Sequence, residues 1–261
     1  MKHWQRHIDK NSRYDQYATS APHPFDMAVV IPCFNEYNLS ATLHSIMHCS
    51  PTRGNVWVII VVNSSETTSP AIVQQNRATY HEVVHFAQQY NRSKLFFTPL
   101  WCSNLSEKQA AMGLERRIGM ECVLRGFFKQ QKSQGIIISL DADCTVSKNY
   151  LCSIEQQFAQ HHPACCVVNF KHRVASSVHE GNTHTLKQAI DQYEQYIRYY
   201  RHALKAIGFP YYYHTIGSAF AVSADAYVRV GGIGRQQAGE DFYFLQKLFE
   251  YGTTHELHRT Y

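Results

Sequence analysis

Short runs of consecutive hydrophobic residues alternate with segments of helical periodicity along the first half of the chain. Four runs have the length and continuity of strands buried on both faces, at residues 27–31, 56–62, 95–97 and 136–140. The segments between them have the apolar spacing of amphipathic helices, at residues 39–47, 72–86 and 107–131. This alternation predicts an α/β fold, a Rossmann-like and mostly parallel sheet flanked by helices on both faces.

The second half has fewer strand-like runs and one long periodic segment. We expect strands at 165–170 and 219–222 and a helix at 242–251. A further amphipathic helix is indicated by apolar residues that step by four and three in turn: Leu186, Ile190, Tyr193, Ile197, Tyr200 and Leu204. We expect Tyr193 and Tyr200, which lie on this stripe, to pack against the rest of the protein.

The first 26 residues differ in composition from the rest of the chain. They are polar, rich in His, Arg and Tyr, and they end in the breaker Ala21-Pro-His-Pro24. We therefore expect an extension at 1–26 that lies over the surface, and then one domain at 27–261. Because such a domain normally continues past the helix at 242–251, we also expect the chain to be truncated at its C-terminus.

Composition narrows the possible partners. The 261 residues are 44% hydrophobic and 17% charged, which is an ordinary globular balance. The formal charge of +5 is too small and too scattered to indicate nucleic acid, although it suits a polyanionic small ligand such as a diphosphate. A weak attraction to an anionic membrane surface is an alternative consequence of the same charge.

The eight cysteines form no CxxC pair and match neither a zinc site nor a disulfide framework, so we expect reduced, mostly buried thiols in a cytoplasmic protein. No stretch approaches the ~18 consecutive apolar residues of a membrane span. Residues 1–26 also lack the apolar run of a signal peptide. We expect a cytoplasmic protein, with peripheral contact at the inner membrane face as the alternative.

Two carboxylates separated by one residue come after the strand at 136–140. Asp141 and Asp143 would repel each other, and a cation between them would offset that repulsion. Mg²⁺ and Mn²⁺ take oxygen ligands and can share them with a diphosphate, whose departure as a leaving group the metal then assists. The competing interpretation is a pair of solvated loop carboxylates.

Other polar clusters carry two interpretations each. Glu240 and Asp241 precede an aromatic helix start, where acids either stabilise the helix N-terminus or serve as a general base. Asn35 and Glu36 come after the first strand and could hold a nucleoside or cap the next helix.

The helix at 107–131 carries Lys108, Arg116 and Arg117. Arginine is suited to bidentate phosphate contacts, yet most basic residues on a helix belong to a solvated face. We expect that simpler role for at least one of the two arginines.

The order of these segments resembles the family 2 glycosyltransferases of the GT-A fold. The likeness rests on Ile-Pro-x-Phe-Asn-Glu at 31–36, a polar exit from the second strand, an arginine-bearing helix, Asp-Ala-Asp at 141–143 and Gly-Glu-Asp at 239–241. It extends from about Met27 to Tyr251. It implies a nucleotide-binding half at 27–145 and an acceptor half at 146–261.

The resemblance also implies roles for residues around the nucleotide. Pro32, Asn35 and Glu36 match the segment that lines the nucleotide pocket. Asn63 to Ser65 match the turn that contacts the base, although the family usually has Asp there.

The diphosphate end of the donor site is implied by further matches. Arg116, with Lys108 nearby, matches the arginine that faces the donor diphosphate. Asp141 and Asp143 match the DxD pair, in which the second carboxylate is the more direct ligand of Mg²⁺ or Mn²⁺.

Asp241 matches the catalytic base of the inverting members of this family, with Glu240 supporting it or contacting the acceptor. The implied reaction transfers a sugar, with inversion, from a nucleotide-diphosphate sugar (UDP-sugar by preference) to a hydroxyl of a glycan, a lipid-linked carrier or another acceptor. The tyrosine-rich stretch from Tyr193 to Tyr213 is a candidate acceptor surface, and we expect His214 and residues 215–218 to line the site. The QxxRW motif of processive synthases is absent, which favours single addition.

Two alternatives from other classes remain. A sugar nucleotidyltransferase would also use an α/β sheet, a metal and paired acids, but it would usually show a glycine-rich phosphate loop near its N-terminus. A non-catalytic nucleotide- or sugar-binding relative would be expected to lack Asp143 or Asp241, and both are present.

Overall fold

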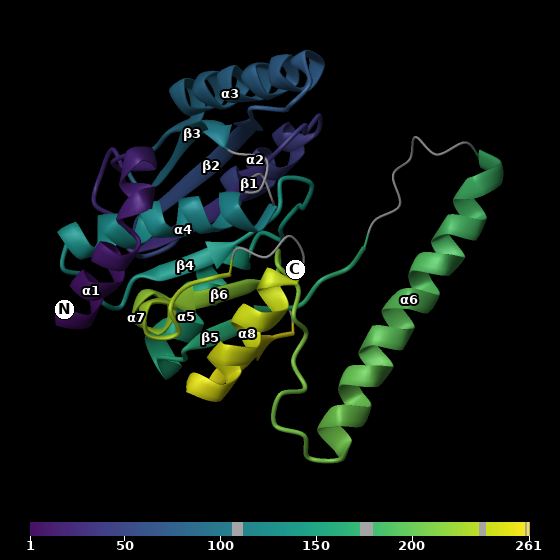
Figure 1. Cartoon of the computed structure of the whole chain (residues 1–261). Helices are drawn as coiled ribbons and strands as arrows, with labels where there is room; N and C mark the ends of the chain where they lie inside the picture. Colours follow the sequence, from purple (N-terminus) through teal and green to yellow (C-terminus); the bar gives the residue numbers. More distant parts are fainter. Residues whose placement is uncertain (106–111, 173–179, 235–238, 259, 261) are drawn as a thin grey trace.

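The computed structural model describes the chain except for residues 106–111, 173–179, 235–238, 259 and 261 (Figure 1). Its centre is one seven-stranded sheet in the order β3-β2-β1-β4-β6-β5-β7. The strands are β1 (Met27–Cys33), β2 (Val56–Ser65), β3 (Leu95–Leu105), β4 (Ile136–Ser139), β5 (Cys165–Val168), β6 (Phe220–Ser223) and β7 (Thr254–Leu257).

The sheet is mostly parallel, as the sequence predicts. β1 pairs in parallel with β2 and β4, β2 with β3, and β5 with β7, whereas β6 runs antiparallel to β4 and β5. Met27 lies opposite both Val56 and Ile136, so β1, β2 and β4 begin in line. Their carboxyl ends therefore open at the same edge of the sheet, where ligands of such sheets bind.

Helices cover both faces of this sheet. They are α1 (Lys2–Lys10), α2 (Leu39–Met47), α3 (Pro70–Tyr90), α4 (Met112–Lys129), α5 (Tyr150–His161), α7 (Ala224–Arg229) and α8 (Glu240–Tyr251), with a 3-10 turn η1 (Ser12–Tyr17) after α1. A further helix, α6 (Glu180–Ala206), lies apart from the sheet (Figure 1). One buried core joins the sheet to α2, α3 and α5, and the other joins it to α1, α4, α7 and α8 (Figure 1).

α4 lies close against the centre of the sheet. A Cβ atom on Gly119 would lie only 2.4 Å from Cγ1 of Val30 and 2.9 Å from Cγ2 of Val61, so only glycine permits this approach. The close contact holds the preceding turn of α4, which carries Arg116, over the ends of β1 and β4.

The N-terminal segment is folded rather than a simple polar extension. α1 and η1 contribute Trp4 and Tyr14 to the core that contains α4, and Phe25 is buried against Trp57 and Phe127. These contacts could not be predicted from the polar composition of the segment, because only a few of its side chains face inward. The division of the chain at residue 26 stays a prediction.

A buried ionic cluster attaches α1 to the domain. Glu121 of α4 is fully buried, and its Oε1 bonds with Nε2 of His7 at 2.9 Å and accepts from the hydroxyl of Tyr227 at 3.3 Å. Oε1 lies 3.5 Å from Nη2 of Arg117, and Oε2 accepts from Nη1 of Arg125 at 3.1 Å. One carboxylate thus links α1, α4 and α7.

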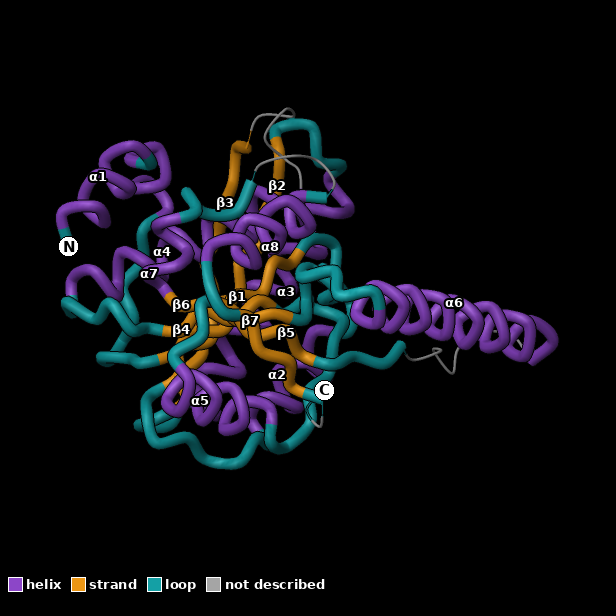
Figure 2. Tube along the Cα trace, turned by 90° about the horizontal axis from the view of Figure 1, so that it is seen from below, coloured by secondary structure: helices purple, strands orange, loops and turns teal. Residues whose placement is uncertain are grey.

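The packing of α6 differs from the prediction. Most of this helix stands apart from the sheet and its flanking helices (Figures 1 and 2). Tyr193 and Tyr200, which were expected to pack inward, are exposed over more than half of their surface. The prediction of inward packing was wrong, because periodicity shows which residues share a face but not whether another element covers that face.

Two further expectations can be compared with the structure. All eight cysteines are free, and five of them are buried, in agreement with the prediction of mostly buried thiols. Within the ranges that the structure describes, no helix combines the length and apolar character needed to cross a membrane.

Replacing Glu121 by Ala should lower the free energy of unfolding by about 3–5 kcal/mol, because it leaves the buried Arg117 without a carboxylate and Arg125 with only the half-exposed Asp15. Denaturant titration of the folded chain measures this change. The matched control is Glu82→Ala on the exposed face of α3, with an expected change within about 0.5 kcal/mol. Equal effects of the two substitutions would show that the cluster contributes no special stability.

Candidate functional site

The site begins where β4 ends. Asp141 comes just after the strand, and the next residues turn back so that the Cys144 N–H donates to the Asp141 carbonyl at 3.2 Å. The Thr42 hydroxyl on α2 donates to the Ala142 carbonyl at 2.6 Å and holds this turn against that helix. Asp141 is partly exposed and Asp143 is exposed, so both carboxylates are accessible at the carboxyl edge of the sheet.

Arg116 joins this turn to the rest of the domain. The side chain is buried, and its Nη1 donates to the Ser139 hydroxyl at 2.5 Å and to the Gly217 carbonyl at 2.9 Å. Its Nη2 donates to Oδ1 of Asp141 at 2.9 Å. A charge so far from water needs partners, and here one guanidinium holds β4, the Asp141 turn and the segment before β6 in a fixed relation.

The acids at the start of α8 lie on the other side of Arg116. Oε1 of Glu240 is 3.9 Å from Nε of Arg116. A Cβ atom on Gly217 would lie 3.0 Å from Oδ2 of Asp241 and 3.1 Å from Nη2 of Arg116, so a side chain there would disturb both groups. The structure therefore brings Asp141, Arg116, Glu240 and Asp241 together around Gly217.

A separate amide network closes the ends of β1 and β2. Asn35 has a left-handed φ of 54°, and its N–H donates to Oδ1 of Asn76 on α3 at 2.8 Å. Nδ2 of Asn76 in turn donates to the Asn63 carbonyl at 2.6 Å. The Oδ1 atoms of Asn35 and Asn63 are buried and have no hydrogen-bond partner among the described residues. Two unpaired acceptors at this edge mark a place suited to an N–H or O–H donor.

The neighbouring predicted residues lie at the same edge. Pro32 occupies the end of β1, and Ser65, at the end of β2, bonds with the Thr68 hydroxyl at 2.8 Å. The Glu36 carbonyl accepts from Nε2 of Gln75 at 2.7 Å. Burial raises the pKa of Glu36, and Asp143 and Asp141 raise it further.

Glu115 is a buried acid beneath this edge. Its Oε1 accepts from Nδ2 of Asn63. Burial raises the pKa of Glu115 to about 8, although the neighbouring Arg116 and the bond from Asn63 oppose the shift. Glu115 therefore carries its proton at neutral pH in most molecules.

The donor set at this edge fits a hard divalent cation. Among the described residues, no group of three or more His, Cys, Asp or Glu side chains is placed to hold a metal ion. Mg²⁺ and Mn²⁺ nevertheless need only one or two protein carboxylates when substrate phosphates and water complete their shell. Negative charge on Asp143 and Asp141 raises the pKa of Glu36 and contributes, after burial, to the rise in the Cys144 pKa to about 12. A cation would offset that charge.

The second half of the chain contributes a separate, aromatic group. His214 lies edge-on to Phe170 at 5.2 Å, and Arg198 lies over the Phe170 ring at 5.3 Å. Burial and then the charges of Arg201 and Arg198 lower the pKa of His214 to about 4, so this imidazole is neutral at pH 7. Of the expected lining segment, Gly217 reaches the Arg116 cluster directly.

Sequence reasoning missed several residues of the site. Lys108 lies outside the described residues, so its predicted role stays a prediction. Asn76, Glu115 and Ser139 were not singled out, yet each contacts a predicted residue. Ser139 could have been identified from the sequence, since it is the one polar residue in the apolar run at 136–140.

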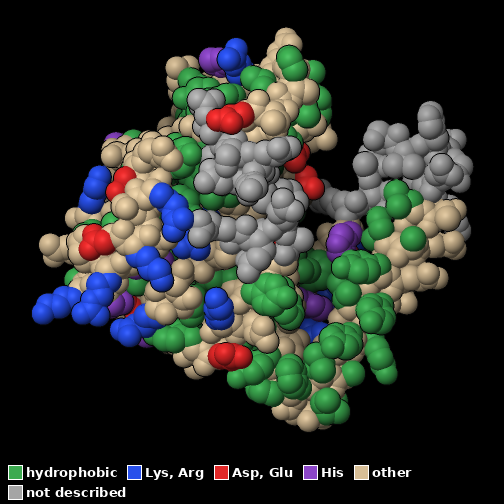
Figure 3. All heavy atoms as spheres, viewed as in Figure 1, with side chains coloured by type: hydrophobic (Ala, Val, Ile, Leu, Met, Phe, Trp, Pro, Cys, Tyr) green, Lys and Arg blue, Asp and Glu red, His purple; other side chains and the backbone are tan. Residues whose placement is uncertain are grey.

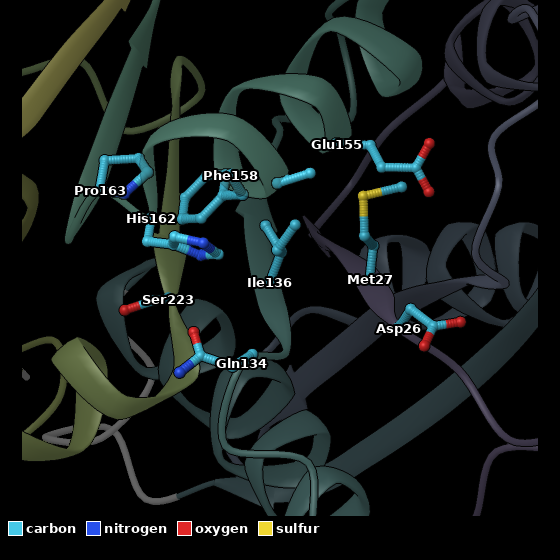
Figure 4. Close-up of a pocket in the computed structure, with 10 residues that line it drawn as sticks. Asp26, Met27, Gln134, Ile136, Glu155, Phe158, His162, Pro163 and Ser223 are labelled. Carbon is cyan, nitrogen blue, oxygen red and sulfur yellow. The ribbon is translucent and has the colours of Figure 1, made fainter.

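A small pocket lies at the opposite edge of the sheet (Figure 4). It has a volume of about 210 Å³ and is lined by the first residues of β1 and β4, Met27 and Ile136, with Phe158 and His162 from the region of α5. None of the predicted site residues lines it, so the candidate site does not depend on this cavity.

Comparison with known proteins identifies the fold. No family model and no curated protein matches the sequence. Among solved structures, residues 1–349 of S. aureus TarS in complex with UDP-GlcNAc match with a TM-score of 0.54 and 14% identity, over 90% of this chain and 56% of that one. The same TarS fragment with UDP gives 0.54 and 13%, over 90% and 58%. A mannosyltransferase from Pyrobaculum calidifontis, PcManGT, with GDP-Man and Mn²⁺, gives 0.50 and 14%, over 99% and 64%.

The fold is of the GT-A glycosyltransferase type. This agrees with the α/β prediction and with the fold that the family resemblance implied. The chain spans little more than half the length of the TarS fragment that it matches. At 13–14% identity the likeness concerns the fold.

The raised pKa of Glu115 predicts a specific pH dependence of stability. The folded chain keeps a proton at Glu115 up to about pH 8, whereas an unfolded chain releases it near pH 4.5. The stabilising contribution is therefore complete below about pH 4.5 and is lost as the pH rises to 8, by up to about 1.4 kcal/mol per pH unit. Glu115→Gln should remove this loss.

Denaturation of the wild type and of Glu115→Gln at several pH values between 5 and 9 measures the difference. The control is Glu82→Gln, an exposed acid on α3, which should track the wild type at every pH. A Glu115→Gln curve parallel to that of the wild type would contradict the pKa assignment.

Proposed function

We propose that this protein is a metal-dependent, inverting glycosyltransferase. It moves a sugar from a nucleotide-diphosphate sugar to a hydroxyl of a glycan, a lipid-linked carrier or another acceptor. The proposal rests on one observation: Arg116 gathers Asp141, Glu240 and the Asp241 region around Gly217 at the carboxyl edge of a GT-A-type sheet. Carboxylates that could accept a proton or bind a metal therefore lie close to a guanidinium whose positive charge suits a diphosphate.

The nucleotide is proposed to lie over the ends of β1 and β2. The unpartnered Oδ1 atoms of Asn35 and Asn63 are acceptors for the N–H groups of a base, with Pro32 and Ser65 beside them. TarS has been solved with UDP and UDP-GlcNAc, and PcManGT with GDP-Man, so proteins of this fold bind nucleotide sugars of more than one base. We retain the UDP-sugar preference as part of the proposal.

The diphosphate is proposed to lie toward Asp141 and Asp143. Asp143, the more exposed of the two, is the principal ligand of Mg²⁺ or Mn²⁺, and Asp141 contributes while Arg116 holds it in place. Bound metal would neutralise the negative charge of the departing diphosphate. PcManGT was solved with Mn²⁺. Arg116 adds positive charge beside the site, although both terminal nitrogens are already bonded to the protein.

The chemical step is a single displacement. The acceptor hydroxyl gives its proton to the Asp241 carboxylate while its oxygen forms a bond to the anomeric carbon of the donor. The bond from that carbon to the diphosphate oxygen breaks on the opposite face, and its electron pair leaves with the nucleoside diphosphate. Glu240 lies beside Arg116 and supports this end of the site.

The acceptor is proposed to approach from the aromatic side. Tyr212 and Tyr213 stack with ring centroids 4.4 Å apart, and His214 comes next along the chain toward Gly217. Aromatic faces of this kind pack well on sugar rings. This places the acceptor hydroxyl between the tyrosines and Asp241.

Donor binding should raise thermal stability in a metal-dependent way. With UDP, GDP or dTDP at about 100 times the dissociation constant, the native state gains about 2.7 kcal/mol, or a shift of about 5–10 °C for a domain of this size. We expect the shift for one nucleotide, only with Mn²⁺ or Mg²⁺, and we expect Asp143→Asn to abolish it. Thermal unfolding of the variants with each nucleotide measures this.

The matched control is Asp191→Asn, which removes an exposed carboxylate from α6 and should shift as the wild type does. A nucleotide shift that persists without metal, or in Asp143→Asn, would contradict the proposed metal site. No shift with any nucleotide would favour a non-catalytic relative, and pyrophosphate release from a nucleoside triphosphate and a sugar phosphate would favour a nucleotidyltransferase.

Asp241→Asn should separate binding from chemistry. We expect turnover of the donor, measured as nucleoside diphosphate released, to fall by about 10²–10⁴-fold, because the acceptor proton loses its base. The thermal shift with nucleotide and metal should persist. Glu250→Gln, an exposed acid on the same helix, should retain full turnover. Undiminished turnover in Asp241→Asn would assign the base to another residue.

A further inference from the structure

α6, with Ile207 just past its end, presents an apolar strip that is covered only in part: the His172 ring lies edge-on to Tyr193, with ring centroids 5.6 Å apart. The strip repeats every seven residues, with Leu186, Tyr193, Tyr200 and Ile207 at one position and Ala189, Tyr196 and Ala203 at the position three residues later. The larger members are exposed: Leu186 by 40%, Tyr193 by 54%, Tyr196 by 65%, Tyr200 by 57% and Ile207 by 78%. Figure 3 shows hydrophobic side chains gathered along the lower part of this helix.

The spacing of this strip is that of a coiled-coil seam. Alternating steps of three and four give an average repeat of 3.5 residues, which keeps one narrow line of side chains facing a partner helix. The charged residues of α6 fit the same seven-residue pattern. Every charged residue between 186 and 207 lies off the seam: Lys187, Asp191, Glu194, Arg198, Arg201 and Lys205. The seam is therefore free of the charges that would oppose burial.

The contacts of α6 with the body leave the seam facing outward. Arg201 binds Glu256 of β7, with its Nε donating at 2.8 Å, and Nη2 of Arg198 donates to the Phe170 carbonyl at 2.6 Å. Glu194 accepts from the His172 N–H at 2.5 Å. These three side chains share a face different from the seam. The body thus fixes the rotation of α6. Tyr196 and Tyr200 lie off the face that it binds, whereas Tyr193 also contacts the His172 ring edge-on at 5.6 Å.

We propose that this seam, formed by Leu186, Ala189, Tyr193, Tyr196, Tyr200, Ala203 and Ile207, docks the α6 seam of a second copy of the chain in antiparallel orientation. An antiparallel pair centred near residue 198 places Tyr193 opposite Ala203 of the second copy. It also places Ile207 opposite the second copy's Ala189. Large residues meet small ones at both ends, as close packing requires.

The centre of the pair has its own complementarity. Tyr196 meets Tyr200 of the second copy, and within one copy these two rings are already nearly parallel, with centroids 6.4 Å apart and planes at 19°. Two such flat pairs can stack offset on each other. Antiparallel orientation also opposes the helix dipoles and places Lys205 level with Asp191 of the second copy.

The area suits a reversible dimer. In this register Leu186 falls level with Pro210, past the end of α6, so four large seam residues form the contact. At about 200 Å² for each such side chain when fully exposed, they present about 500 Å² in each copy and about 1,000 Å² in the pair, at the lower limit for a specific interface. A membrane surface fits less well, since interfacial helices border a broad apolar face with lysine and arginine, whereas Arg198 and Arg201 are bonded on the body side.

The oligomeric state of the full chain tests this proposal. Sedimentation equilibrium over a range of concentrations should show a monomer–dimer equilibrium. Tyr200→Glu should raise the dimer dissociation constant by at least about tenfold, because it buries an unpaired charge. The matched control is Gln195→Glu, which adds the same charge at an exposed position off the seam and should leave the constant unchanged. Circular dichroism and thermal unfolding of each variant establish that the monomer is folded.

The antiparallel register has a separate test. Tyr193→Ala and Ala203→Tyr should each weaken the dimer, because one leaves a cavity and the other meets Tyr193 of the second copy. The double variant exchanges the large and small members of the same layer and should recover most of the wild-type constant. Failure of the double variant to improve on the singles would overturn the antiparallel register.

Other outcomes would overturn the docking of a second copy altogether. A chain that stays monomeric at all concentrations, or a dimer that Tyr200→Glu leaves intact, contradicts the interface. Sedimentation of the monomer with anionic lipid vesicles, lost in Tyr200→Glu and retained in Gln195→Glu, would assign the seam to a membrane surface instead.

Discussion

The arrangement of the candidate site depends on one buried cation. Arg116 reaches the edge of the sheet from α4 and bonds to Ser139, to the Gly217 carbonyl and to Asp141. An unpaired guanidinium in this position would be costly, so the surrounding elements are held where they can satisfy it. The turn after β4, the segment before β6 and the start of α8 come from distant parts of the chain, and this one side chain defines their relative positions.

α4 also carries buried charged residues away from the site. Glu121 and Arg125, further along α4, are buried as well, and their partners come from α1, η1 and α7. α4 therefore connects the N-terminal segment to the candidate site through polar contacts, while Gly119 sets its distance from the sheet. A disturbance of α1 would be transmitted first to this helix, and so to the turn that carries Arg116.

Much of the fold could be predicted from local pattern, and the failures have identifiable causes. The runs at 27–31, 56–62 and 136–140 became β1, β2 and β4 because continuous apolar segments can be buried only between two layers of helices. The helical N-terminal segment was missed, since Trp4 and Tyr14 are isolated apolar residues in a polar context. The exposure of Tyr193 and Tyr200 was not predicted, because apolar periodicity shows which residues share a helix face but not which element packs against that face.

The sequence by itself determined the α/β class, the succession of strands along the chain and the acids and amides expected at the strand ends. These depend on local periodicity and on the rule that parallel strands share a carboxyl edge. Only the tertiary structure decided that Arg116 bonds to Asp141, that Asn76 joins β1 to β2, and that Gly217 lies against Asp241. The hydrogen bonds of Arg116 join residues 23 to 101 positions apart, and the chain folds them together only because buried charges and amides must find partners.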